Sequence, residues 1–135
     1  MIRPKLVLSV AVALALTGGV SASPSRAEPP PPCSFTLSPP QLVQISGVDM
    51  VSATLAPAGC GPMAGPYLSV ACLQIQDGDS STQCMQAHGT DPAQVYYTPY
   101  RPGATYASTG RGCASWLGQP PAPLCQLLGP YTATV

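Results

Sequence analysis

The stretch Leu68-Ser69-Val70-Ala71-Cys72-Leu73-Gln74-Ile75-Gln76 decides the fold class of this chain. Its side chains alternate with a period of two, which is the period of a β-strand. Leu68, Val70 and Cys72 share one face, and the intervening residues share the other. Both faces are fairly apolar, which predicts a central strand. The turn signal Asp77-Gly78-Asp79 follows, and residues 82–87 resume an extended pattern, so we expect a β-hairpin here.

Further short extended runs lie on both sides of this hairpin and are separated by turn residues. They cover residues 34–37, 41–45, 48–56, 93–98, 105–109 and 131–135, whereas 57–62 and 113–125 are expected as loops. After residue 28 no stretch has a convincing helical period. Short strands at regular spacing predict an all-β, immunoglobulin- or fibronectin-like antiparallel β-sandwich of about seven strands, stabilised by disulfides.

Composition excludes several other classes of protein. The 135 residues suit one domain. They include 13 Gly and 18 Pro, which argues against a helical bundle because both residues destabilise helices. A net charge of zero with only five basic residues argues against nucleic-acid binding. With 45% hydrophobic and 7% charged residues, the chain also lacks the composition of a disordered protein.

The N-terminal residues have the three-part pattern of a secretory signal peptide. Arg3 and Lys5 precede an apolar run over 6–20, and small residues follow. The run is shorter than the roughly 20 residues that span a bilayer, so we expect no stable membrane insertion after cleavage. Cleavage after Ala22 or Ala27 fits the pattern, and Ala27 is preferred because Glu28 and four prolines then form an extended mature N-terminus. The expected organisation is a signal peptide over 1–27, a Pro-rich arm over 28–32 and one disulfide-rich domain over 33–135.

The mature chain is acidic and contains all of the cysteines. Its two arginines and five acids give a formal charge of −3. Six cysteines in a small exported domain predict a disulfide framework in an oxidising compartment. Zinc is disfavoured because no cysteines are closely spaced and only one His is present. Fifteen pairings are possible, and neighbours in sequence favour Cys33 with Cys60, Cys72 with Cys84, and Cys113 with Cys125.

The segment Tyr100-Arg101-Pro102-Gly103-Ala104-Thr105-Tyr106 resembles the part of fibronectin type III domains that leads into the sixth strand. The resemblance implies that Tyr106 forms a tyrosine corner, in which the hydroxyl bonds to upstream backbone and pins the crossover between two sheets. The sequence departs from that family at Ala104, where Thr is favoured, and at Tyr100, where Leu is favoured. An ordinary Pro-Gly turn followed by a strand is the alternative.

A broader resemblance concerns cellular location. The end of the signal peptide, the Glu-Pro-Pro-Pro-Pro start and the low charge resemble small exported proteins of mycobacteria and other actinobacteria whose activity is unassigned. The resemblance implies a secreted protein or one retained at the cell envelope. It implies nothing about the activity.

Residues for catalysis or metal binding are scarce. His88 is the single His and precedes a loop signal, and no Gly-x-Ser-x-Gly motif presents a serine. Asp77 and Asp79 suit a hairpin turn better than a calcium loop, which needs further acids. Cys84 with His88 cannot form a blue-copper site, which requires two His. We therefore expect no enzyme activity, no cofactor and no metal.

Tyrosines and arginines supply a candidate binding surface. Tyrosine offers a large contact area together with a hydroxyl, which suits recognition. One of Tyr96 and Tyr97 must face outward because strand side chains alternate. The alternative is that one Tyr lies in the core while the others cover a sheet edge. The candidate surface comprises Tyr96, Tyr97, Tyr100, Arg101, Arg111 and Trp116.

These observations favour a secreted non-catalytic recognition or interaction module whose ligand is a protein, a glycan or a small molecule. The alternative is an extracellular small-molecule carrier. In size, export and acidity the chain is similar to chromophore-binding apoproteins of the neocarzinostatin type, but it has six cysteines where two bridges are usual. A small secreted hydrolase lacks its catalytic residues here, and no binding-loop signature identifies a protease inhibitor.

Overall fold

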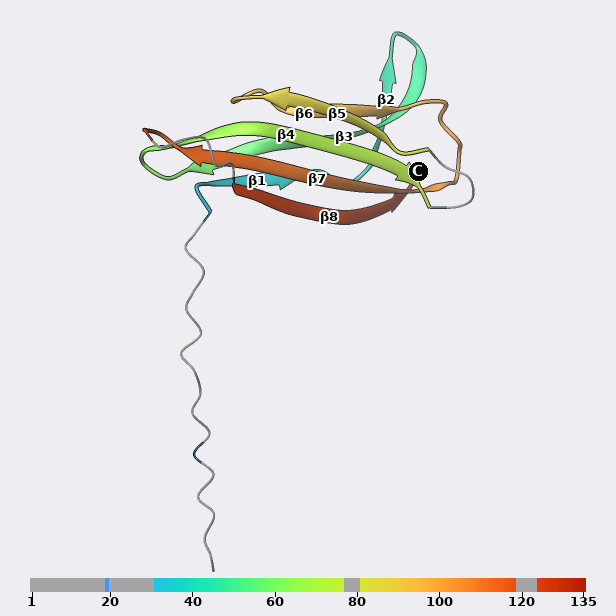
Figure 1. The fold of residues 1–135 in the computed structure, drawn as a ribbon. Coiled ribbons are helices and arrows are strands. Elements are labelled where there is room, and N and C mark those ends of the chain that lie inside the picture. Colours follow the sequence, from blue (N-terminus) through green and yellow to red (C-terminus); the bar gives the residue numbers. More distant parts are fainter. Residues whose placement is uncertain (1–18, 20–30, 77–80, 119–123) are drawn as a thin grey trace, which may run out of the picture.

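The computed structural model describes residues 19, 31–76, 81–118 and 124–135, and its regular elements are all β-strands (Figure 1). The predicted signal peptide, most of the Pro-rich arm and the turn at Asp77 and Asp79 lie outside the described residues. The strands are β1 (Cys33–Leu37), β2 (Gln41–Ile45), β3 (Val48–Cys60), β4 (Ala64–Ile75), β5 (Gln83–His88), β6 (Ala93–Tyr97), β7 (Thr105–Trp116) and β8 (Leu124–Thr134).

The strands form two antiparallel four-stranded sheets that pack face to face. In the first sheet, β3 is central. β1 and β2 pair with successive parts of one of its edges, and β6 pairs with the other. The second sheet has the order β5-β4-β7-β8. The expected all-β antiparallel sandwich is confirmed, with eight strands rather than about seven.

Two segments that were expected as loops are partly strand. β3 continues through Pro57 to Cys60, and β7 and β8 include residues 113–116 and 124–125 of the second segment. The prolines inside strands lie at register shifts: Pro57 opposite Phe35, Pro66 next to the irregularity in β4, and Pro130 at the shift between β7 and β8. Proline cannot donate a ladder hydrogen bond, so a β-bulge accommodates it without ending the strand.

The core forms where alternate side chains of both sheets meet. Its residues include Phe35, Val51, Leu55, Leu73, Val95 and Tyr106. Glycine is required at two positions of β7, because a Cβ at Gly110 would overlap the Leu55 side chain and a Cβ at Gly112 would overlap the Phe35 ring. Large side chains of one sheet therefore fit against glycines of the other.

Three disulfides join neighbouring strands, in the pairing that sequence order favours: Cys33–Cys60, Cys72–Cys84 and Cys113–Cys125. Each links an outer strand to its inner neighbour within one sheet, and the bridged residues are direct cross-strand partners. The bridges therefore hold β1, β5 and β8 in register. Three disulfides also suit an oxidising environment outside the cytosol.

Hydrogen bonds, and no disulfide among the described residues, add to the apolar core in joining the two sheets. The fully buried Tyr106 accepts a hydrogen bond from the Arg101 backbone N–H at 3.0 Å. This bond spans the crossover from β6 to β7, where a tyrosine corner is expected. Elsewhere the Gln83 amide donates to the Thr98 carbonyl at 2.9 Å, and the Ser108 hydroxyl donates to the Ser38 carbonyl at 2.9 Å.

Candidate functional site

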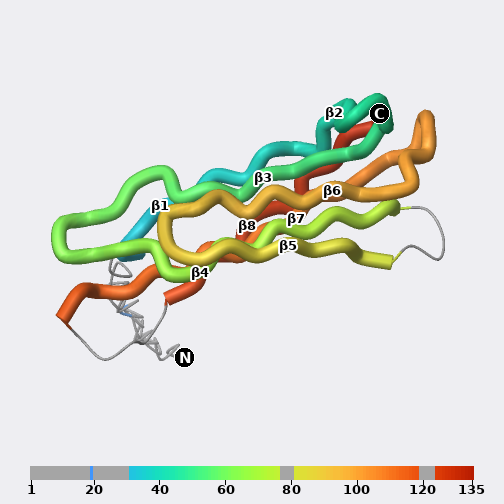
Figure 2. Tube along the Cα trace, turned by 90° about the horizontal axis from the view of Figure 1, so that it is seen from above, coloured from blue at the N-terminus to red at the C-terminus, as the bar shows by residue number. Residues whose placement is uncertain are grey.

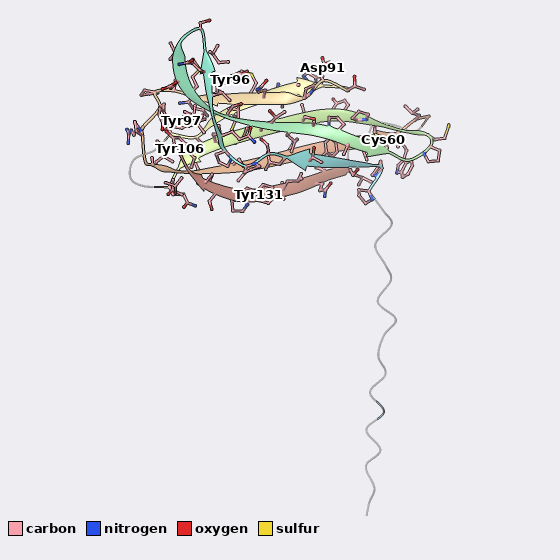
Figure 3. The ribbon with its side chains drawn as sticks, turned by 180° about the vertical axis from the view of Figure 1, so that it is seen from behind. Cys60, Asp91, Tyr96, Tyr97, Tyr106 and Tyr131 are labelled. Carbon is pink, nitrogen blue, oxygen red and sulfur yellow. A yellow bond between two sulfur atoms is a disulfide. The ribbon has the colours of Figure 1, made fainter. Side chains whose placement is uncertain are left out.

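The six residues of the candidate binding surface do not form one surface. Tyr97 is the partner of Val51 in β3, whereas Trp116 is the partner of Ala64 in β4. Val51 is nine residues before Cys60, so these positions lie roughly 30 Å apart along the extended chain. In Figure 3, Tyr96, Tyr97 and Tyr106 lie toward one end of the sandwich and Cys60 toward the other. Tyr96 and Tyr97 therefore lie at a different end of the sandwich from Trp116.

Tyr97 must be removed from the binding surface. It is only 5% exposed, and its ring packs edge-to-face on Tyr106 with the centroids 5.4 Å apart. Strand alternation explains this: Ala93, Val95 and Tyr97 point into the core, and Tyr96 points outward. Tyr100 is half-buried and packs against the core, so only part of the tyrosine cluster is available to a partner.

The two arginines of the domain are exposed but separate. Arg101 supplies its backbone to the Tyr106 hydroxyl. Arg111 lies in the middle of β7, opposite Leu127 of β8. Arg111 and Leu127 help to line a shallow groove of about 280 Å³ on the second sheet, together with Val70, Cys72, Thr109, Gly110, Leu128 and Gly129. The groove offers mainly apolar contact with one cation beside it.

Residues considered for catalysis are dispersed. His88 is exposed at the end of β5, where its ring meets that of Tyr67 at a centroid distance of 6.5 Å. Cys84 is bonded to Cys72. Within the described ranges, no three residues among His, Cys, Asp and Glu lie close enough together to hold a metal ion.

A different cluster stands out at the end where β3 turns into β4. The Ala64 N–H donates to the Gly61 carbonyl at 3.2 Å, so residues 61–64 form a β-turn. Pro62 occupies the second position and Met63 the third, with a φ of 66° at Met63. This is a type II turn, whose third position normally holds Gly or Asn because φ is positive there. Met63 nevertheless occupies it, with 67% of its surface exposed.

Three more large apolar side chains lie beside this turn. The Leu117 N–H donates to the Met63 carbonyl at 2.7 Å, which joins the end of β7 to the turn. The Trp116 ring lies over Gly61, and Leu124 pairs with Ala114 at the start of β8. Exposure is 37% for Trp116, 58% for Leu117 and 52% for Leu124. We call Met63, Trp116, Leu117 and Leu124 the apolar end.

The apolar end is uncharged and firmly supported. Residues 57–67 and 114–125 contain no Asp, Glu, Lys or Arg. Cys60 lies three residues before Met63 and is bonded to Cys33, and Cys125 follows Leu124 and is bonded to Cys113. Two of the three bridges therefore flank these four side chains, which are presented by a rigid base.

Sequence reasoning identified Trp116 but missed its neighbours. Met63 lies in a segment rich in Gly and Pro that reads as loop, and Leu117 and Leu124 flank another such segment. One signal in the sequence could have indicated the cluster. Met63 directly follows Pro62, at a turn position where Gly is favoured. The grouping itself depends on the pairing of β4 with β7, which brings Ala64 opposite Trp116.

Comparisons with protein-family models, curated proteins and solved structures found no match to this chain. The described part of the chain contains no helix of the length and apolarity needed to cross a membrane.

Proposed function

We propose that this chain is an exported, non-catalytic recognition module that binds its partner through the apolar end. The carrying observation is Met63: an exposed apolar side chain at a turn position where it costs backbone strain. An L-residue in the left-handed region costs about 1–2 kcal/mol relative to the right-handed one, and such strain at an exposed position is a reason to look for function. Leu117 and Leu124 are further exposed apolar side chains at the same end of the sandwich.

The rest of the proposal concerns export and fold. A signal peptide over 1–27 delivers the domain to an oxidising compartment, where the three disulfides form. The Tyr106–Arg101 hydrogen bond supports a fibronectin type III-like crossover. The resemblance to small exported proteins of mycobacteria and other actinobacteria supports secretion or retention at the cell envelope.

The test is retention of the exported protein at the cell envelope of an actinobacterial host. We expect the unmodified protein to fractionate with the envelope and the Met63→Gly and Leu117→Ser variants to shift into the medium. Leu42→Ser is the matched control, because Leu42 is a similarly exposed leucine on the β2–β3 hairpin. Equal retention of all four proteins would refute recognition through the apolar end.

A small-molecule carrier is the second candidate, and the groove beside Arg111 is the observation that favours it. An apolar floor with one guanidinium suits an amphiphile that carries a negative charge. Native mass spectrometry of the exported protein tests this directly. Retained mass that is lost in an Arg111→Gln variant supports a carrier, and a bare protein counts against it.

A further inference from the structure

We infer that the apolar end inserts reversibly into the surface of a lipid bilayer, as a peripheral contact and not as a membrane-spanning segment, and that this bilayer is the partner of the proposed recognition module. This inference rests on the proposed function, because it names the partner of the same four residues. It is carried by three observations: the charge and shape of the apolar end, the bonding of its backbone, and the place where the chain enters the domain.

The charge and shape of the apolar end suit a soft apolar phase. The segments that form it contain no Asp, Glu, Lys or Arg, so insertion requires no charge to be desolvated. The β3–β4 turn projects past the β5–β6 connection at the same end of the sandwich (Figure 2). A projecting apolar turn needs either a matching concave pocket or a deformable layer. Tryptophan beside aliphatic side chains is the composition found where proteins meet the membrane interface.

The backbone on either side of the turn tip forms hydrogen bonds within the protein. The N–H groups of Gly61, Ala64 and Leu117 donate to the carbonyls of Pro32, Gly61 and Met63 respectively. Pro62 has no N–H group to satisfy. Hydrocarbon offers no hydrogen-bond partners, so backbone that enters it must be bonded within the protein. These bonds meet that requirement beside the tip. The Pro62 carbonyl and the Met63 N–H form no bond among the described residues, so this one peptide group stays at the depth of the headgroups and water.

The chain enters the domain at this same end. Pro32 immediately precedes β1, and its carbonyl accepts the Gly61 N–H at 2.9 Å. The sequence before β1 contains the apolar run over 6–20, and only residues 21–32 separate it from the domain. Until the expected cleavage, a signal peptide in the membrane would keep the start of β1, and with it the apolar end, within 12 residues of the bilayer.

The test uses vesicles of phosphatidylcholine and the exported protein, with its N-terminus identified by intact mass. Trp116 is the only tryptophan of the chain, so its fluorescence reports on the apolar end alone. We expect its emission to shift to shorter wavelength on addition of vesicles and to be quenched by brominated acyl chains. Added anionic lipid should not strengthen binding, because the apolar end has no basic residue.

The variants separate insertion from adsorption. Met63→Gly and Leu117→Ser should each lower the vesicle partition coefficient by about tenfold, from the apolar area they withhold from the bilayer. Leu42→Ser should leave it unchanged. An equal fall for Leu42→Ser would overturn the inference, because binding would then be non-specific adsorption.

Failure of the inference differs from failure of the proposed function. If the cell envelope retains the protein through Met63 and Leu117 but vesicles leave the Trp116 emission unchanged, the partner is a protein or glycan and the lipid inference is wrong. If neither the envelope nor the vesicles respond to these variants, both the inference and the proposed function fail.

Discussion

The two ends of β3 solve the same problem, a sharp reversal of the chain, with different residues. At one end Ser46 and Gly47 connect β2 to β3 with φ values of 50° and 81°. Two positive φ values are the requirement of a type I′ hairpin turn, and small residues meet it there. At the other end, Met63 takes a positive φ in a type II turn. Local backbone geometry accounts for Gly47 but for neither Ser46 nor Met63, and of these two only Met63 exposes a large apolar side chain.

The ends also differ in how they are held. Disulfides Cys33–Cys60 and Cys113–Cys125 flank the apolar end. The paired part of the β2–β3 hairpin, over 41–52, contains no cysteine and is held by its ladder, with Gln44 donating to the Asp49 carboxylate at 3.4 Å. A two-stranded ribbon is marginal by itself, so the hairpin depends more on local bonding. The apolar end is therefore the more rigidly held of the two ends.

The largest expected effect is the loss of a bridge at the apolar end. Replacing Cys33 and Cys60 together by alanine should lower the free energy of unfolding by about 3.5 kcal/mol, because the bridge closes a loop of 27 residues. The corresponding variant of Cys72 and Cys84, with a separation of 12, should lose about 3 kcal/mol. Urea unfolding monitored by circular dichroism measures both.

The order of these two losses tests the comparison of the ends. Cys33 is buried in the core and Cys84 is exposed, so cavity formation should widen the gap in the same direction. A larger loss for the Cys72 and Cys84 variant would show that the Cys33–Cys60 bridge contributes less to the stability of the domain than the Cys72–Cys84 bridge does.

A smaller loss of stability is expected at the opposite end of the sandwich, where a hydrogen bond from the Arg101 N–H to the Tyr106 hydroxyl holds the crossover. Tyr106→Phe removes the acceptor of the Arg101 N–H and should lower the free energy of unfolding by about 1–2 kcal/mol. Tyr97→Phe is the matched control, because Tyr97 is the buried ring beside Tyr106 and its hydroxyl forms no hydrogen bond within the described residues. Equal losses in the two variants would mean that the Tyr106 hydroxyl does not pin the crossover.

Local patterns in the sequence were sufficient for most strands. Residues 68–76 and 93–98 alternate cleanly and correspond to β4 and β6 within a few residues. Cross-strand pairing of Cys72 with Cys84 followed from the same hairpin. These features depend on neighbours along the chain, so a single sequence contains enough information to predict them.

Features set by the opposite sheet could not be predicted in this way. Gly110 and Gly112 disfavour a strand by local propensity, which is why β7 was expected to end at residue 109. Glycine is needed at both positions because the Leu55 and Phe35 side chains pack directly against them. This contact exists only once the two sheets have packed together. The apolar end was missed for a similar reason: Met63 and Leu117 are 54 residues apart in sequence and meet through the register of β4 and β7.

The smallest expected change in stability separates function from backbone strain. Met63→Gly relieves a positive φ worth about 1–2 kcal/mol but adds the flexibility of glycine to the unfolded chain, at a cost of about 0.4–1 kcal/mol. The net expectation is a domain more stable by roughly 0.5 kcal/mol. Ser46→Gly makes the same change at the hairpin end and should give a similar gain. Urea unfolding of both variants gives these values, and vesicle partitioning of the same samples gives their binding.

If Met63 is retained for binding, Met63→Gly gains stability and loses binding, whereas Ser46→Gly gains stability alone. A loss of more than about 1 kcal/mol in Met63→Gly would instead show that the Met63 side chain is needed for packing, and the strain at this turn would then have a structural reason.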